Sequence, residues 1–318
     1  MRLLAVNTET ILVGGPLPHI RGTPWETLMS DPAERTGDQP HRHHVDVCGL
    51  THPGLVRTEN QDHFLIATLH KSMRILQSSM PEDALGSLES PSRGHVFLVA
   101  DGVGGGPRGR EASRTALRAI VDYVLKAMDL YVQLDDEIEP QFQAELRRSV
   151  ELSHQAVRQA GEGDDERTGM ATTLTMVCFR WPKAYIVHVG DSRGYRLRDG
   201  RLELLTKDQT MAQAMVDAGA LSPDQAARSR LNHILYSAVG GSRAEPYTVV
   251  TDVRWDDRML LCTDGITKHV SEVEIQGALE RMTTAEATAH DLLQLALDRG
   301  GSDNTTLIVG RLNRGTGG

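Results

Sequence analysis

The chain has 318 residues, of which 39% are apolar, and its formal net charge is −9. This length and composition suffice for a large buried core in one large domain or two small ones. The negative charge argues against broad binding to nucleic acid or to an anionic membrane, because both reward an excess of Lys and Arg. No stretch approaches the roughly 18 apolar residues of a membrane span. The three dispersed cysteines are typical of a reducing compartment, so we expect a cytoplasmic location.

The first predicted segment, residues 1–44, is rich in Pro, Gly, Thr and charge without periodicity, which predicts an irregular or disordered extension. A folded domain is expected over 45–312, and a flexible tail over 313–318. Its strands are predicted from apolar and β-branched runs between turn residues. They are Val45–Leu50, Gln61–Leu69, His95–Ala100, Ala171–Phe179, Ala184–Val189, Gly194–Arg198, Arg201–Leu205, Tyr247–Thr251 and Arg258–Thr263.

Two connections between these strands are informative. The polar residues 70–93 predict a loop insertion. Asp199-Gly200 predicts a two-residue type I′ hairpin, because both central residues of that turn need a positive φ.

Two long helices are predicted after the third strand, since apolar residues keep to one helical face over 112–131 and again over 142–157. An acidic turn separates them, which favours an antiparallel pair on a sheet face. Later helices show capping-box starts, and the last has a glycine stop; these signals are at Ser222, Ser271, Thr283 and Gly300. The mixture lacks a regular βαβ rhythm, so we predict an α+β fold with antiparallel sheets.

Two glycine motifs suggest competing functions. Gly104–Gly109 satisfies the dinucleotide pattern G-x-G-x-x-G, but a second long helix follows where a parallel strand is required. Gly190–Gly194 satisfies the serine-hydrolase pattern G-x-S-x-G around Ser192, but the chain continues as a hairpin strand where a helix is required. Both interpretations are therefore disfavoured.

Four aspartates at the ends of strand-like runs form a third candidate. They are Asp101, Asp191, Asp264 and Asp303, and three of them adjoin a glycine. One such aspartate alone is best explained as a turn residue. Four together predict a carboxylate cluster that binds a hard cation such as Mg²⁺ or Mn²⁺. Two such ions about 4 Å apart can clamp a phosphoryl group and activate a bridging water, and Arg57 is suited to grip the phosphate.

These residues resemble the motifs of the metal-dependent serine/threonine protein phosphatases, the PP2C or PPM family, and particularly its bacterial-type members. The resemblance extends from about Val45 to Leu312. Its motifs are Arg57–Asp62, Val99–Gly105, Thr172–Leu174, Gly190–Arg193, Leu261–Gly265 and Ser302–Thr306.

The resemblance implies a central β-sandwich of two antiparallel sheets flanked by pairs of helices, with two metal ions in a cleft at one end. Asp101 would bridge both ions, and Gly102 would offer its carbonyl to one of them. Asp264 and Asp303 would hold the other ion. The remaining implied roles are substrate phosphate binding by Arg57, support of the site by Asn304, a further metal contact by Asp62, and a weaker third ion at Asp191.

The sequence departs from the family pattern at three positions. Gln61 replaces a frequent Glu, which leaves Asp62 as the metal-binding candidate in that motif. Val103 replaces the histidine that eukaryotic members use as a proposed general acid, as is usual in bacterial-type members. Lys268 replaces a frequent acidic residue that shares the third ion. We hypothesise that its ammonium weakens or replaces that ion by electrostatic repulsion.

The resemblance also implies a mobile flap over residues 209–241 beside the cleft, where Met211, Met215 and Leu221 either select substrates or simply pack. The sequence therefore predicts a protein phosphatase that hydrolyses phosphoserine and phosphothreonine with a metal-bridged hydroxide and opposes a Ser/Thr kinase. The alternative is a catalytically weak module that binds phosphoproteins or regulates a kinase.

Overall fold

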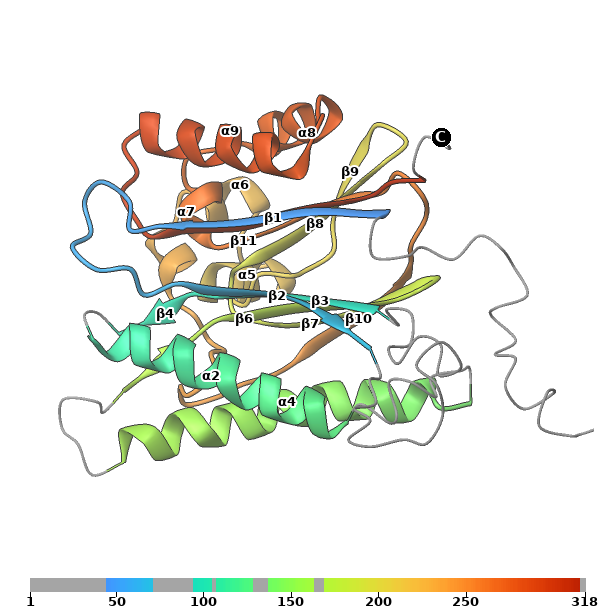
Figure 1. The fold of residues 1–318 in the computed structure, drawn as a ribbon. Coiled ribbons are helices and arrows are strands. Elements are labelled where there is room, and N and C mark those ends of the chain that lie inside the picture. The colour runs from blue at the N-terminus through green and yellow to red at the C-terminus, as the bar shows by residue number, and fades with distance from the viewer. Residues whose placement is uncertain (1–43, 71–93, 105–106, 128–136, 163–168, 315–318) are drawn as a thin grey trace, which may run out of the picture. The chain divides into compact units, whose positions relative to one another are not determined.

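The structure is a computed structural model that describes residues 44–70, 94–104, 107–127, 137–162 and 169–314. All of these belong to one compact unit over residues 40–318. Two five-stranded antiparallel sheets lie face to face, with orders β1-β12-β11-β8-β9 and β10-β7-β6-β3-β2 (Figure 1). The predicted extension over 1–44 and insertion over 70–93 lie almost wholly outside the described residues.

The strand bounds follow the predicted ones closely, except that β12 was not among the predicted ranges. The first sheet contains β1 (Val45–His52), β12 (Thr305–Leu312), β11 (Arg258–Cys262), β8 (Arg193–Arg198) and β9 (Arg201–Leu204). The second contains β10 (Tyr247–Asp252), β7 (Lys183–Val189), β6 (Leu174–Arg180), β3 (Gly94–Ala100) and β2 (His63–Leu69). A separate pair joins β4 (Gly102–Val103) to β5 (Ala171–Thr172). The strand predicted over 171–179 is thus two strands, because Thr173 between them bonds to the backbone of Asp101.

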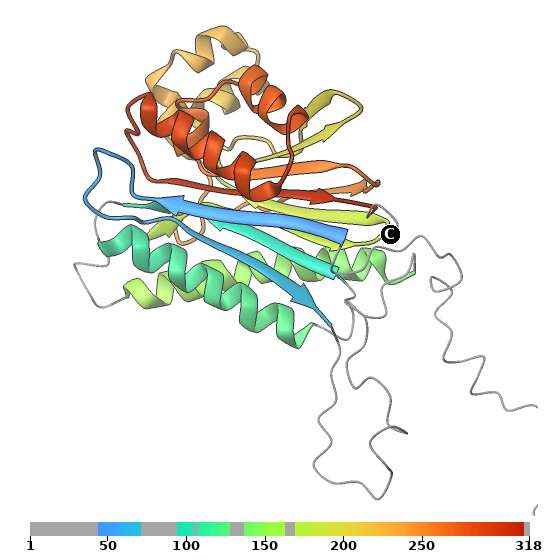
Figure 2. The same cartoon turned by 45° about the horizontal axis from the view of Figure 1, so that its top comes forward.

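Helices cover both outer faces of the sandwich (Figures 1 and 2). The antiparallel helices α2 (Pro107–Lys126) and α4 (Glu139–Gly161) cover the β10-β7-β6-β3-β2 sheet, and α8 (Glu272–Glu280) and α9 (Ala285–Asp298) cover the other. The short helix α7 (Asp264–Thr267) follows β11 directly. The predicted α+β class, sandwich and helix pair are therefore confirmed.

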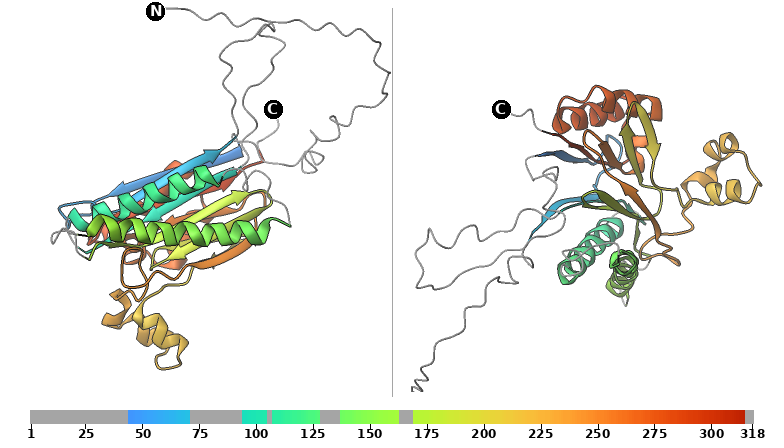
Figure 3. Two further views of the ribbon diagram at one scale, coloured as in Figure 1. Left: turned by 90° about the horizontal axis from the view of Figure 1, so that it is seen from below. Right: turned by 90° about the vertical axis from the view of Figure 1, so that its right-hand side faces the viewer.

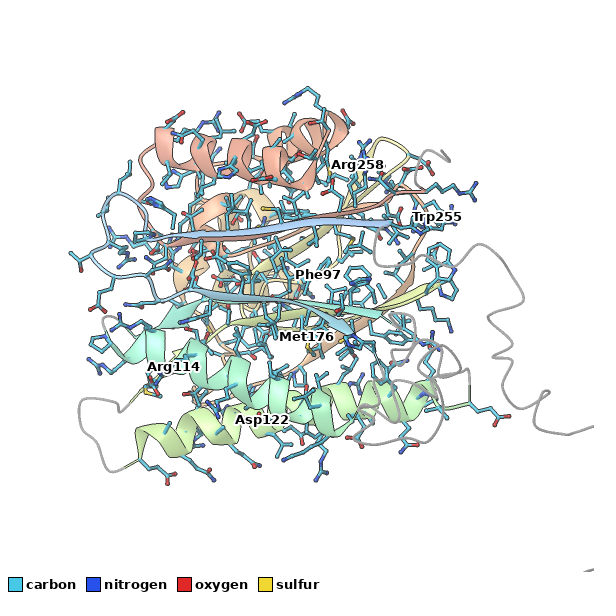
Figure 4. The ribbon with its side chains drawn as sticks, in the orientation of Figure 1. Phe97, Arg114, Asp122, Met176, Trp255 and Arg258 are labelled. Carbon is cyan, nitrogen blue, oxygen red and sulfur yellow. The ribbon has the colours of Figure 1, made fainter. Side chains whose placement is uncertain are left out.

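The core has three layers, which explains why β3 is apolar without alternation. Phe97 and Val99 point between the sheets, where they meet Leu261 and Ile308. Leu98 points the other way, into the layer beneath α2 and α4 that also contains Met176. Figure 4 shows Phe97 and Met176 in these two layers. Both faces of β3 are thus buried, and burial of apolar side chains is the main stabilising term of such a fold.

The local sequence signals for turns and helix starts predicted some positions correctly and one incorrectly. Asp199 and Gly200 have φ values of 50° and 73°, which confirms the hairpin between β8 and β9. Ser222 forms the predicted capping box with Gln225. The predicted start at Thr283 is wrong by one residue, because Thr284 is the N-cap and its side chain accepts from the Ala287 N–H. Among the described residues, no helix is both long and apolar enough to cross a membrane.

Candidate metal centre

A cavity of about 740 Å³ is lined by residues of the β1–β2 connection, of β4 and of α7. These three segments lie at the same end of the sandwich (Figure 1). Its lining includes Arg57 and all four strand-end aspartates: Asp101, Asp191, Asp264 and Asp303. We call this cavity the aspartate cleft. Each aspartate lies within two residues of the end or the start of a strand, so the sandwich itself carries the carboxylates to one place.

Asp101 is held through its backbone by two threonines. The Asp101 N–H donates to the Thr173 hydroxyl at 2.9 Å, and the Asp101 carbonyl accepts from the Thr173 N–H and the Thr172 hydroxyl, both at 2.8 Å. Because the backbone is fixed in this way, the side chain has a defined position at the cleft. The sequence contained Thr172 and Thr173 as a motif, but gave no sign of this role.

Two glycines beside the aspartates are required by close backbone approach. A Cβ on Gly102 would lie 2.1 Å from the carbonyl oxygen of Gly109, and one on Gly265 would lie 2.0 Å from that of Asn304. No larger residue fits at either position. At each Asp-Gly pair, the glycine therefore lets the backbone of the site pack directly against the backbone of another segment.

Asp62 lies behind the cleft rather than in its lining. It is 4% exposed, and its Oδ2 accepts from the Thr263 hydroxyl at 2.8 Å. Its Oδ1 is buried and has no hydrogen-bond partner. A buried carboxylate oxygen without a partner is costly, and a cation would satisfy it.

Asp303 and Asp264 belong to a chain of charges that also contains Arg57 and Lys268. Arg57 forms a bidentate pair with Asp303, in which Nε donates to Oδ1 at 2.8 Å and Nη2 donates to Oδ2 at 3.0 Å. Lys268 Nζ lies 2.6 Å from Asp264 Oδ2 and 2.7 Å from Asp303 Oδ2. Asp264 Oδ1 is buried and has no partner.

The electrostatics distinguish Asp303 from the other carboxylates. Burial raises the pKa of Asp62 and that of Asp191 to about 7 each. It raises the pKa of Asp101 well above its usual range. Repulsion from neighbouring aspartates adds to each of these shifts. Burial also raises the pKa of Asp264, although Lys268 opposes the shift. Burial would raise the pKa of Asp303 too, but Arg57 and Lys268 hold it below its usual value. Burial and mutual repulsion therefore outweigh the nearby positive charge at Asp62, Asp101, Asp191 and Asp264, but not at Asp303.

The donor set fits hard divalent cations. It consists of carboxylate oxygens, some without partners, and carboxylates that repel one another are neutralised by such ions. Among the described residues, no three Asp, Glu, His or Cys side chains already gather around one point as ligands of an ion would. Oxygens of Asp303 and Asp264 are paired with Arg57 and Lys268.

Asn304 connects the two segments that carry Arg57 and Asp303. Its Nδ2 donates to the carbonyls of Pro53 and Glu59 at 2.9 and 2.8 Å, and its Oδ1 accepts from the Gln61 N–H at 2.9 Å. These three bonds hold the β1–β2 connection against the start of β12. The contacts support the expected role of Asn304 in bracing the site.

The structure disfavours the serine-hydrolase interpretation. Ser192 is fully buried, and its hydroxyl bonds to that of Thr173 at 2.8 Å. His188 bonds to Thr175 through Nδ1 and to backbone carbonyls through Nε2. No strand-to-helix elbow exposes Ser192, because β8 follows it.

The resemblance implied a flap over residues 209–241 beside the cleft, but sequence reasoning did not name the residues of this region that line the cleft. The helices α5 (Met211–Asp217) and α6 (Pro223–Ala227) lead to the 3₁₀ helix η4 (Arg230–His233). The last residue of η4, His233, and the segment that follows, with Tyr236 and Arg243, contribute to the lining. The short helices project from the sandwich (Figure 3). No periodicity or motif marks these three residues, since their position depends on how the segment folds back onto the cleft.

The sequence pattern of protein phosphatase 2C matches residues 72–298 of this chain. The chain belongs to the protein phosphatase 2C family. This family membership agrees with the sandwich and with the carboxylate cleft at its end.

Two relatives and one solved structure are informative. The serine/threonine protein phosphatase PstP of Mycobacterium tuberculosis is 37% identical over 214 residues, which are 67% of this chain and 40% of the relative. The chain described here thus matches less than half of the length of PstP. The serine/threonine phosphatase stp of Listeria welshimeri is 31% identical and is aligned over 72% of this chain and 88% of its own length.

The solved structure is the catalytic domain of the serine/threonine protein phosphatase PstP in complex with two manganese ions. It has a TM-score of 0.65 and 30% identity, and the match covers 85% of this chain and 98% of that one. The fold of this chain is therefore one on which a two-manganese complex is known.

Proposed function

We propose that this chain is a Mg²⁺- or Mn²⁺-dependent protein phosphatase that hydrolyses phosphoserine and phosphothreonine. The observation that carries the proposal is the convergence of four strand-end aspartates and one arginine on a single cleft. Family membership supports the reaction class, and partnerless buried oxygens on Asp62 and Asp264 support a cation requirement.

The ligand roles proposed here are those that the resemblance to the family implies. Asp101 and the carbonyl of Gly102 would hold one ion. Asp101, Asp264 and Asp303 would hold a second, and Asp62 offers a further oxygen behind them. When bound, the pair of ions would activate water for in-line attack on phosphorus and offset the charge of the phosphate.

Arg57 would bind the substrate phosphate. Its guanidinium is charged at any relevant pH and presents a planar fork that matches phosphate oxygens. The side chain is 55% exposed at the cleft, so a phosphoprotein can reach it. Asp303 orients the fork through two hydrogen bonds, and Asn304 holds the loop on which Arg57 lies.

One observation favours the alternative of a catalytically weak binding module. Both oxygens of Asp303 already accept hydrogen bonds from Arg57, and one of them also accepts from Lys268. A chain that kept these pairs would bind phosphoproteins without hydrolysing them. The retention of Asp101, Asp264 and Asp303 together weighs against it, since a binding module does not need all three.

The test is hydrolysis of p-nitrophenyl phosphate and of a phosphothreonine peptide by purified protein after EDTA treatment, with Mn²⁺ or Mg²⁺ added back. Asp101→Asn is assayed in parallel. Activity that returns with the metal and is lost in the variant supports the phosphatase. An inactive wild type with bound metal would favour the binding module.

We further propose that phosphoserine and phosphothreonine proteins are the substrates, and that a Ser/Thr kinase produces them. We also propose a cytoplasmic location. It is supported by Cys48, Cys178 and Cys262, which are all free thiols.

A further inference from the structure

Lys268 is placed at the metal centre by one turn of helix. It follows α7, which begins at Asp264, and its N–H donates to the Asp264 carbonyl at 2.8 Å. Residues four apart on a helix lie on the same face, so the ammonium can reach the Asp264 carboxylate, which it contacts at 2.6 Å. Its side chain is only 25% exposed.

The ammonium is shared between two elements of the fold. Its contacts with Oδ2 of Asp264 and Oδ2 of Asp303 join the end of β11 to the start of β12. It also attracts the negative charge of Asp191, which lines the same cleft. Two of the four strand-end aspartates therefore contact this one lysine, and a third lines the same cleft.

The free oxygens show where ions remain possible. Asp264 keeps a buried, partnerless Oδ1 while Lys268 holds its Oδ2. One divalent ion and the ammonium can therefore share Asp264. A further divalent ion between Asp264 and Asp191 would lie beside the ammonium, and like charges repel strongly where water is scarce.

We propose that Lys268 is a tethered cation that takes the place of a third divalent ion, so that this cleft binds two Mn²⁺ ions and no more. The ammonium pairs Asp264 with Asp303 before metal arrives and supplies one positive charge afterwards. The inference rests on the proposed two-ion function and adds a metal-specificity role for a residue that does not itself bind metal.

The experiment counts Mn²⁺ per chain in the chelator-treated 318-residue protein by calorimetric titration, with elemental analysis after removal of free ion. Lys268→Asp replaces the cation with a ligand, and Lys268→Met removes the charge alone. Lys207→Met is the matched control, because Lys207 forms a comparable 2.8 Å pair with Asp217 outside the cleft. Thermal unfolding with and without Mn²⁺ provides a readout that does not depend on activity.

We expect two ions in wild type and in Lys207→Met, and three in Lys268→Asp. Lys268→Met should lower the Tm of the metal-free protein and give a larger Mn²⁺-induced rise in Tm than wild type shows. That readout decides the question even if the Asp variant does not fold. A purely structural ion pair would lower the Tm of the metal-free and loaded protein equally.

Three ions in wild type, or an unchanged count and affinity in Lys268→Asp, would overturn the role of Lys268 while leaving the phosphatase proposal intact. Absence of Mn²⁺ binding in wild type would instead overturn the two-ion function, and the present inference with it.

Discussion

Replacement of Asp62 by asparagine should make the metal-free protein less sensitive to pH. Asp62 is buried behind the cleft, and burial raises its pKa from 3.8 to about 7. A carboxyl whose pKa is higher in the folded state binds more protons there than in the unfolded chain. Its stabilising contribution is therefore complete below pH 4 and is lost as the pH rises to about 7.

The magnitude follows from the size of the shift. A pKa shift from 3.8 to about 7 lowers the free energy of unfolding by on the order of 4 kcal/mol above pH 7. Less than half of this loss of stability is already present at pH 5. For a domain of this size, the remaining difference of about 3 kcal/mol corresponds to a Tm change of roughly 5–10 °C.

The assay compares the Tm of EDTA-treated wild type and Asp62→Asn from pH 5 to pH 8. Between pH 5 and pH 8, the Tm of the variant should rise relative to the Tm of wild type by roughly 5–10 °C. Its amide oxygen can keep the bond from the Thr263 hydroxyl. An unpaired amide group in place of Oδ1 would add a cost that does not change with pH. Asp62→Asn also removes the repulsion by which Asp62 raises the pKa of Asp101, so the variant loses part of that pH dependence as well, in the same direction.

Asp122→Asn is the control, since this carboxylate is exposed on α2 (Figure 4). Saturating Mn²⁺ should reduce the pH dependence of wild type, because a nearby cation stabilises the ionised form of Asp62. A Tm difference between wild type and Asp62→Asn that stays constant from pH 5 to pH 8 would refute the reasoning.

Four further outcomes are expected. Arg57→Ala should raise KM for a small phosphate ester roughly 10- to 100-fold with a smaller fall in kcat, since bonds to charged groups contribute about 1.5–3 kcal/mol; steady-state kinetics check this, and equal losses in both constants contradict it. Asp101→Asn should remove nearly all hydrolysis while circular dichroism and Tm show a folded protein. Ser192→Ala should keep activity and its EDTA sensitivity, whereas a serine hydrolase would lose activity in this variant and would not need metal. Leu261→Ala, at a fully buried position between the sheets, should cost about 2–5 kcal/mol in denaturant unfolding, and a loss below 1 kcal/mol would mean that the core can close around the cavity.

The sequence alone determined the features that depend on neighbouring residues. Alternating and continuous apolar runs located the strands, and the Asp199-Gly200 pair determined the hairpin because only a few residues tolerate two positive φ values in a row. The strand-end aspartates could be recognised together because an ionisable residue directly after a buried run is unusual. The resemblance to a phosphatase family then supplied the sandwich and the candidate site residues.

Only the tertiary structure decided which side chains meet. Arg57 reaches Asp303 because β1 pairs with β12 in a register that sets His52 opposite Thr305, so the loop after one strand lies beside the loop before the other. The Thr173–Asp101 bonds and the second contact of Lys268 with Asp303 likewise join segments far apart in the chain. Such contacts depend on strand order, register and burial across the whole domain, and no local pattern encodes them.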